Sequence, residues 1–98
     1  MNDISPKELR ERLNSGEKLV IIDVREEWEY EEKNIGALNI PLNSIPEELN
    51  QLLEFKKKEI IVHCKSGKRS GQAKKYLTQH EFTHVRSLIG GFDQYLND

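Results

Sequence analysis

Residues 59–71 read EIIVHCKSGKRSG, and this stretch indicates the fold more clearly than any other. Its apolar run is typical of a buried strand and ends at Cys64. A loop that contains Gly67 follows, and a helical pattern then runs from about Ser70 to Gln79. We therefore expect a strand, a tight loop and a helix, with the cysteine at the carboxyl end of the strand.

The rest of the chain repeats this alternation of β-rich runs and helical patterns. Further strands are expected at 19–24, 37–40 and 85–89. Helices are expected to begin at the Ser5-Pro6-Lys7-Glu8 capping box, to span 26–33 and 46–55, and to follow Gly91. Such an order predicts one α/β domain over residues 1–98, with a central parallel sheet of four to five strands flanked by helices. Ligands of such sheets bind beyond the carboxyl ends of the strands, where Cys64 is expected.

Individual side chains also have expected places. Trp28 and Tyr30 of the acidic segment 26–33 are predicted to anchor that helix in the core. Three leucines of the segment 46–55 are predicted to point inward, namely Leu49, Leu52 and Leu53.

Composition limits the possible functions. The formal net charge of −2 is too close to zero to predict nucleic-acid binding. No apolar run approaches the ~18 residues that span a membrane, and the amino terminus lacks a signal-peptide layout. The single cysteine excludes an internal disulfide, which fits a reducing cytoplasm. Charge is uneven, because residues 1–55 carry a net charge of −7 and residues 56–98 carry +5. Two oppositely charged faces would explain this, as would an anionic ligand handled by the second half.

The loop after Cys64 has the composition of an anion-binding site. Backbone N–H groups of a tight, glycine-containing loop can converge on an anion, and the following helix adds the positive end of its dipole. Lys65, Lys68 and Arg69 add positive charge. A thiol in that field should have a lowered pKa and form a nucleophilic thiolate. The alternative, that Cys64 is only a small buried apolar residue, is less favoured beside three cations.

Four motifs in order resemble the rhodanese family of sulfurtransferases over nearly the whole chain. They are IDVRE at 22–26 with Trp28-Glu29-Tyr30, IGALNIP at 35–41, the loop from Cys64 to Ser70, and Gly90-Gly91-Phe92. Two features depart from the family pattern. The stretch Lys33-Asn34-Ile35-Gly36 is shortened and lacks a histidine. Tyr95 is the nearest counterpart of the tryptophan that often follows the double glycine.

This resemblance implies sulfur transfer through a persulfide on Cys64, without a cofactor or a metal ion. A small anionic donor such as thiosulfate would supply the sulfur, and a thiol or cyanide would accept it. The resemblance assigns substrate binding to the loop residues Lys65, Ser66, Gly67, Lys68, Arg69 and Ser70. Asp23 and Arg25 would brace the loop through ion pairs, with Asp23–Arg69 as the expected pair.

Other functions remain open. Phosphatases and arsenate reductases of this fold carry five residues between the cysteine and the arginine, whereas Cys64 and Arg69 enclose four. A sulfur-carrier module that takes sulfur from a protein persulfide donor is a further alternative. His80-Glu81-Phe82-Thr83-His84 spells a zinc-protease pattern, but it falls between a helix end and a strand start, where both histidines cannot share a helix face. His63 should point away from the thiol, because adjacent strand residues face opposite sides.

Overall fold

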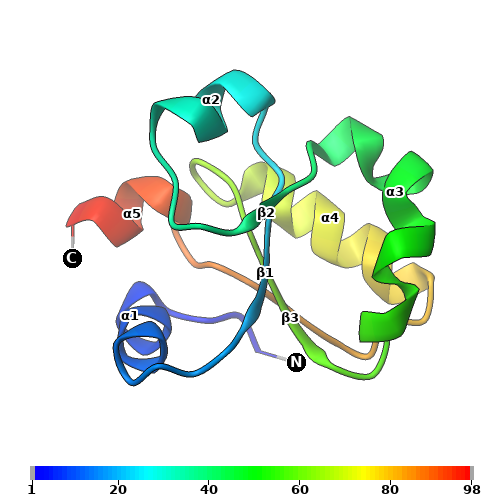
Figure 1. The fold of residues 1–98 in the computed structure, drawn as a ribbon, viewed down its shortest axis with the longest axis horizontal. Coiled ribbons are helices and arrows are strands. Elements are labelled where there is room, and N and C mark those ends of the chain that lie inside the picture. The colour runs from blue at the N-terminus through cyan, green and yellow to red at the C-terminus, as the bar shows by residue number, and fades with distance from the viewer. Residues whose placement is uncertain (1, 98) are drawn as a thin grey trace.

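The computed structural model describes residues 2–97 and contains one four-stranded parallel sheet. The strands lie in the order β2-β1-β3-β4 (Figure 1). Their bounds are β1 Val20–Asp23, β2 Leu38–Asn39, β3 Glu59–His63 and β4 His84–Ser87. The predicted parallel sheet of four to five strands is therefore confirmed, and the strand before Cys64 has the expected bounds.

Helices cover both faces of this sheet. Their bounds are α1 Pro6–Asn14, α2 Glu27–Glu32, α3 Ile45–Leu52, α4 Lys68–Gln79 and α5 Gly91–Asn97, with short 3₁₀ turns η1 Leu42–Ser44 and η2 Leu53–Phe55. Helices α3 and α4 pack on one face, and α1 and α5 pack together on the other. Helix α2 lies beyond one end of the strands (Figure 1).

The core is divided by the two inner strands, β1 and β3. Ile60 and Val62 face the cluster under α3 and α4, whereas Ile61 faces the cluster under α1 and α5. All three side chains are fully buried. The near-continuous apolar runs in the sequence therefore belong to strands that are covered on both faces, as parallel strands usually are.

Local sequence signals act at two helix starts. The Ser5 hydroxyl accepts a hydrogen bond from the backbone N–H of Glu8, 3.1 Å away, and so caps α1. Gly67 has a φ of +107°, a left-handed conformation that glycine adopts without strain. Helix α4 begins directly after it at Lys68, two residues earlier than the sequence pattern predicted.

Two predictions of core position are wrong. Trp28 is 62% exposed and Leu53 is 44% exposed. Trp28 is not buried because α2 lies beyond the end of the sheet rather than on a face of it. Leu53 is not buried because α3 ends at Leu52, and the turn η2 redirects the next side chain. Tyr30 is half-buried, and its hydroxyl donates a hydrogen bond to the carbonyl oxygen of Ala37 at 2.6 Å.

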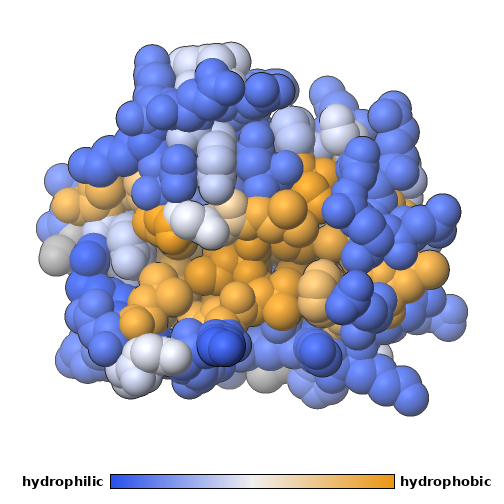
Figure 2. Space-filling view, in the orientation of Figure 1, coloured by the Kyte–Doolittle hydropathy of each residue, from blue (hydrophilic) through white to orange (hydrophobic). Residues whose placement is uncertain are grey.

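The surface in view is largely hydrophilic around an apolar centre (Figure 2). Leu38 of the edge strand β2 is 45% exposed. Within residues 2–97, no helix combines the length and the apolar character that crossing a membrane would require.

Candidate active site

Cys64 lies directly after β3, at the carboxyl edge of the sheet. Its neighbour His63 pairs in register with Asp23, the last residue of β1, so the ends of the two central strands lie side by side. The cysteine side chain is 1% exposed. This is the position that the strand, loop and helix pattern predicted.

The loop after Cys64 folds back over its sulfur. The backbone N–H of Gly67 lies 3.1 Å from Sγ, and the N–H of Ser70 lies 3.3 Å from it. The thiol also lies within hydrogen-bond distance of the Ser70 hydroxyl, at 3.6 Å. The first N–H groups of a helix have no partner within the helix, so the head of α4 is free to point donors at an anion.

These donors lower the pKa of the thiol. Burial alone would raise it, but hydrogen bonds from the Ser70 hydroxyl and from the N–H groups of Ser70, Gly67 and Ser66 outweigh the burial. The pKa of Cys64 therefore lies below its ordinary value. The sequence predicted this direction from the loop N–H groups, the helix dipole and the nearby cations, and in the structure the lowering comes from hydrogen bonds that the loop makes to the sulfur.

The three cations of the loop have different surroundings. Lys65 and Lys68 are exposed. The guanidinium group of Arg69 instead donates two hydrogen bonds to the carboxylate of Glu29 in α2, at 2.6 and 3.0 Å. Hydrogen bonding from Arg69 lowers the pKa of Glu29 to about 2. Glu29 was not predicted as a site residue, although it belongs to the Trp28-Glu29-Tyr30 motif.

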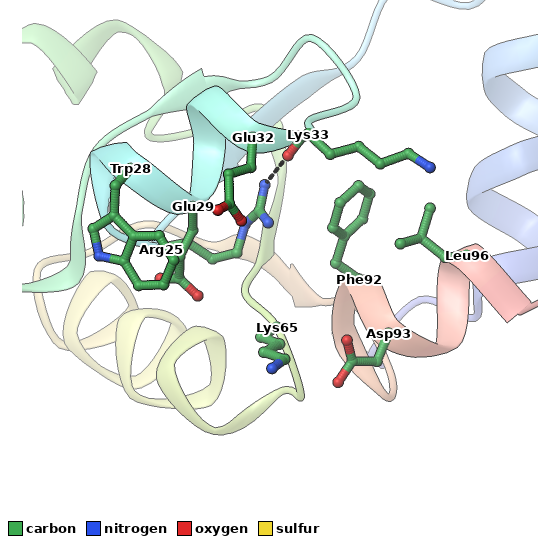
Figure 3. A pocket seen from close by; sticks show the side chains of 9 residues that line it. All are labelled: Arg25, Trp28, Glu29, Glu32, Lys33, Lys65, Phe92, Asp93 and Leu96. Atoms are coloured by element: carbon green, nitrogen blue, oxygen red, sulfur yellow. Dashed lines mark hydrogen bonds between the residues drawn. The ribbon is translucent and has the colours of Figure 1, made fainter.

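The expected ion pair between Asp23 and Arg69 is wrong. Asp23 is fully buried and pairs with Arg25, whose Nη2 lies 2.8 Å from Oδ2. Because Arg25 follows Asp23 by two residues, its side chain turns back to the same carboxylate, while Arg69 leaves α4 on the side of α2. Arg25 also donates a hydrogen bond to the carbonyl oxygen of Lys33 at 2.7 Å (Figure 3).

Helix α5 supports the loop from the other side. The N–H of Phe92 donates to the carbonyl oxygen of Cys64 at 2.7 Å, and the N–H of Asp93 donates to that of Lys65 at 3.0 Å. The guanidinium carbon of Arg25 lies 4.5 Å from the centre of the Phe92 ring. Arg25, which pairs with Asp23, thus lies against the ring of a residue whose backbone N–H bonds to the loop, and the bracing role of Asp23 and Arg25 remains a prediction.

A hollow of about 220 Å³ lies between α2, the loop and α5. Its wall consists of Arg25, Trp28, Glu29, Glu32, Lys33, Lys65, Phe92, Asp93 and Leu96. Figure 3 shows the side chains of α2 and α5 on two sides of this hollow, with Lys65 between them. The hollow is therefore open space directly beside Lys65, the first residue of the loop after Cys64.

Ser87, at the end of β4, is a buried polar residue that the sequence analysis missed. It is 5% exposed, and its Oγ lies 2.7 Å from Oγ of Ser70. No sequence pattern indicates it, because only the pairing of β3 with β4 brings Ser87 beside the N-terminus of α4.

A comparison with protein-family models decides which family this arrangement belongs to. The model described as "Rhodanese-like domain" matches residues 5–98. The chain belongs to the rhodanese-like domain family. This finding confirms the resemblance that the four sequence motifs suggested.

Relatives of this rhodanese-like chain include named sulfurtransferases. Thiosulfate sulfurtransferase PspE of Escherichia coli is 37% identical over 70 residues, which cover 70% of this chain and 67% of PspE. The putative sulfur carrier protein YrkF of Bacillus subtilis is 36% identical over 90 residues, covering 91% of this chain and 48% of YrkF. The crystal structure of SSP1007 from Staphylococcus saprophyticus superposes with a TM-score of 0.85 at 35% identity, covering 97% of this chain and 93% of that one. The relatives support sulfur transfer in general.

The histidines of this rhodanese-like domain lie outside the loop. His63 is fully buried, with its ring 5.8 Å from that of Phe92 and its Nε2 3.5 Å from the carboxylate of Asp23. His80 caps the end of α4, whereas His84 begins β4, so the two do not share a helix face. Among residues 2–97, no group of three or more side chains has the arrangement of a metal site.

Proposed function

We propose that this protein is a thiosulfate-type sulfurtransferase that carries sulfur as a persulfide on Cys64. The observation that supports this most is the set of hydrogen-bond donors around Sγ, from the N–H groups of Gly67 and Ser70 and the hydroxyl of Ser70. They favour a thiolate at a buried position, where an unassisted thiol would stay protonated.

In the proposed first step, the Cys64 thiolate attacks the outer sulfur of thiosulfate. A bond forms between Sγ and that sulfur, the sulfur–sulfur bond of thiosulfate breaks, and sulfite leaves with its electron pair. The product is a persulfide anion on Cys64. The loop N–H groups that stabilise the thiolate lie where they can also stabilise this anion, as donors do in an oxyanion hole.

In the proposed second step, an acceptor attacks the outer sulfur of the persulfide. Cyanide leaves as thiocyanate, or a thiolate leaves as a new persulfide, and the Cys64 thiolate is regenerated. Neither step transfers a proton, so no general acid or base is needed. Lys65 and Lys68, both exposed beside the loop, would attract the doubly charged donor. Arg69 shares its charge with Glu29 and would contribute less.

A sulfur-carrier role is the second candidate. The similarity to YrkF, named as a putative sulfur carrier protein, favours it. So does the 1% exposure of Cys64, because a partner protein could open the loop as it docks. Trp28 and Leu96, which are 62% and 47% exposed on the wall of the hollow, would offer apolar contacts to such a partner.

Intact-mass spectrometry after brief exposure to thiosulfate tests the proposal. Wild type should gain one sulfur atom, ~32 Da, and lose it again on addition of cyanide, whereas Cys64→Ser should gain nothing. Alkylation of Cys64 in a parallel sample shows that the thiol is reactive. Ready alkylation without a sulfur adduct would contradict the thiosulfate activity. Sulfur uptake from a protein persulfide alone would then identify the carrier role.

A further inference from the structure

Ser87 has a buried hydroxyl group that takes no part in the proposed reaction steps. Its side chain enters the interior from the end of β4 and is 5% exposed. Within the described residues 2–97, Ser70 Oγ is the one hydrogen-bond partner of Ser87 Oγ, at 2.7 Å. Ser70 in turn lies 3.6 Å from the sulfur of Cys64. The two serines therefore link the edge strand β4 to the thiol.

The direction of the hydrogen bond between the two serines follows from the number of donors. Each hydroxyl has one hydrogen and two lone pairs. The Ser70 hydroxyl has three hydrogen-bonding neighbours: Sγ of Cys64, Oγ of Ser87 and the carbonyl oxygen of Gly67, which lies 3.2 Å away. Among residues 2–97, the Ser87 hydroxyl has Ser70 as its one hydrogen-bond partner. Because a buried donor without an acceptor is costly, Ser87 donates and Ser70 accepts.

This donation leaves the hydrogen of Ser70 free for two other acceptors. While Cys64 is a thiol, its S–H donates to Ser70, and Ser70 donates to the carbonyl oxygen of Gly67. When Cys64 loses its proton, the hydroxyl of Ser70 can rotate and donate to the sulfur instead. Ser87 donates to Ser70 in both states. Because hydrogen bonds in a chain polarise one another, the donation strengthens the bond from Ser70 to the sulfur.

We propose that Ser87 is a positioning residue for the Cys64 thiolate, acting through the hydroxyl of Ser70. It holds the oxygen of Ser70 beside the sulfur and keeps the hydrogen of Ser70 available to it. The inference rests on the proposed function only in taking the thiolate as the reactive form.

Other charges around Cys64 stay unchanged when Ser87 is replaced. The charged or titratable side chains beside the Cys64 loop are Asp23 at the end of β1, Arg25 after β1, Glu29 of α2, His63 of β3, Lys65 of the loop, Lys68 and Arg69 of α4, and Asp93 of α5. A change in the titration of the thiol in a Ser87 variant therefore reports on the hydroxyl chain.

The test is the pH dependence of Cys64 alkylation by iodoacetamide, which needs no sulfur donor. Ser87→Ala should move the midpoint upward by about 0.5 pH unit, a roughly threefold loss of thiolate below the midpoint. Ser70→Ala should move it by about one unit. Ser87→Thr keeps the hydroxyl and should have the wild-type midpoint. If Ser87→Ala folds poorly, a changed midpoint in Ser87→Thr would contradict the inference.

The double variant Ser70→Ala/Ser87→Ala separates positioning from a general structural role. If Ser87 acts only through Ser70, the double variant should have the midpoint of Ser70→Ala alone. Additive shifts, or a wild-type midpoint in folded Ser87→Ala, would overturn the inference. Because alkylation is measured without thiosulfate, these results are independent of whether thiosulfate is the donor.

Discussion

Gly91 determines how closely α5 can approach the active-site loop. A Cβ atom at this position would lie 2.7 Å from the backbone nitrogen of Ser66 and even closer to the carbonyl group of Lys65. The φ of Gly91 is +65°, which disfavours any side chain. Glycine at this position therefore allows α5 to hold the loop through the N–H groups of Phe92 and Asp93.

We expect Gly91→Ala to lower the free energy of unfolding by about 2–4 kcal/mol, because backbone strain and overpacking act together. Gly71→Ala is the matched control. Gly71 lies inside α4, and apart from its chain neighbours and the backbone of the helix itself nothing lies within 4 Å of its would-be Cβ, so alanine should stabilise by about 0.5–1 kcal/mol. Urea unfolding of both variants measures the difference. Equal free energies of unfolding for Gly91→Ala and Gly71→Ala would contradict the close approach of α5 to the loop.

The sequence predicted the place of the candidate site better than its internal contacts. A strand followed by a glycine loop and a helix sufficed to put Cys64 at the carboxyl edge and to indicate its lowered pKa. The partner of Arg69 was wrong, because it depends on the path of α2, which no local pattern determines. Ser87 was missed for a similar reason, since only strand pairing brings it near Ser70.

At the scale of elements, α2 is held in place mainly by polar contacts. None of its six residues is buried. It is joined to the rest of the fold by the Arg69–Glu29 pair, by the bond from Arg25 to the Lys33 carbonyl oxygen, and by the bond from the Tyr30 hydroxyl. The longer helices were predicted well because an apolar stripe identifies them, whereas the burial of a six-residue helix depends on where its flanking turns direct it.

We expect Glu29→Gln to lower the free energy of unfolding by about 1 kcal/mol at pH 7, through loss of a two-bond ion pair between α2 and α4. The pKa of Glu29 falls from 4.5 to about 2 on folding, so this stabilisation is present above about pH 4.5 and is lost as the pH falls toward 2. The difference between wild type and variant should therefore narrow between pH 6 and pH 3 in urea unfolding.

Glu31→Gln provides the control for this prediction, since Glu31 is an exposed carboxylate on the same helix. Replacing the Glu31 carboxylate should leave the free energy of unfolding nearly unchanged at both pH 6 and pH 3. If Glu31→Gln destabilised the protein as much as Glu29→Gln, the effect would belong to the overall charge of α2 rather than to the pair with Arg69.

At the scale of the whole molecule, acidic residues of the first half of the chain, 1–55, form ion pairs with basic residues of the second half, 56–98. Residues 1–55 carry −7 and residues 56–98 carry +5. Within residues 2–97, three ion pairs connect an acidic residue of the first half with a basic residue of the second, namely Asp3–Lys74, Glu8–Arg86 and Glu29–Arg69. These pairs give the segregated charges a structural role besides that of attracting an anionic ligand.

These three pairs, together with the pairs of Glu59 with Arg12 and Arg86, make the stability of the fold depend on pH in the acidic range. Hydrogen bonds from the basic partners lower the pKa of four carboxyl groups, those of Asp3, Glu8, Glu29 and Glu59, against the opposing effect of burial. A carboxyl group whose pKa falls on folding stabilises the protein above its unfolded pKa. That stabilisation is lost as the pH falls from about 4.5 toward the folded values.

His63 adds a second titration at higher pH. Burial lowers the pKa of its imidazole, and the nearby Asp23 carboxylate only partly offsets this. His63 therefore takes up a proton near pH 6.5 in the unfolded chain and only at a lower pH in the folded chain. As the pH falls below about 6.5, the folded state loses stability relative to the unfolded state.

We therefore expect the free energy of unfolding to fall in two stages between pH 7.5 and pH 3, the first from His63 and the second from the paired carboxylates. Urea unfolding in steps of half a pH unit would resolve them. His63→Phe should remove the first stage and leave the second. Salt at 1 M should shrink the second stage, because the paired carboxylates are partly exposed, and should leave the first, because the imidazole is buried. A first stage that persists in His63→Phe would show that another group titrates there and would contradict a neutral, buried His63.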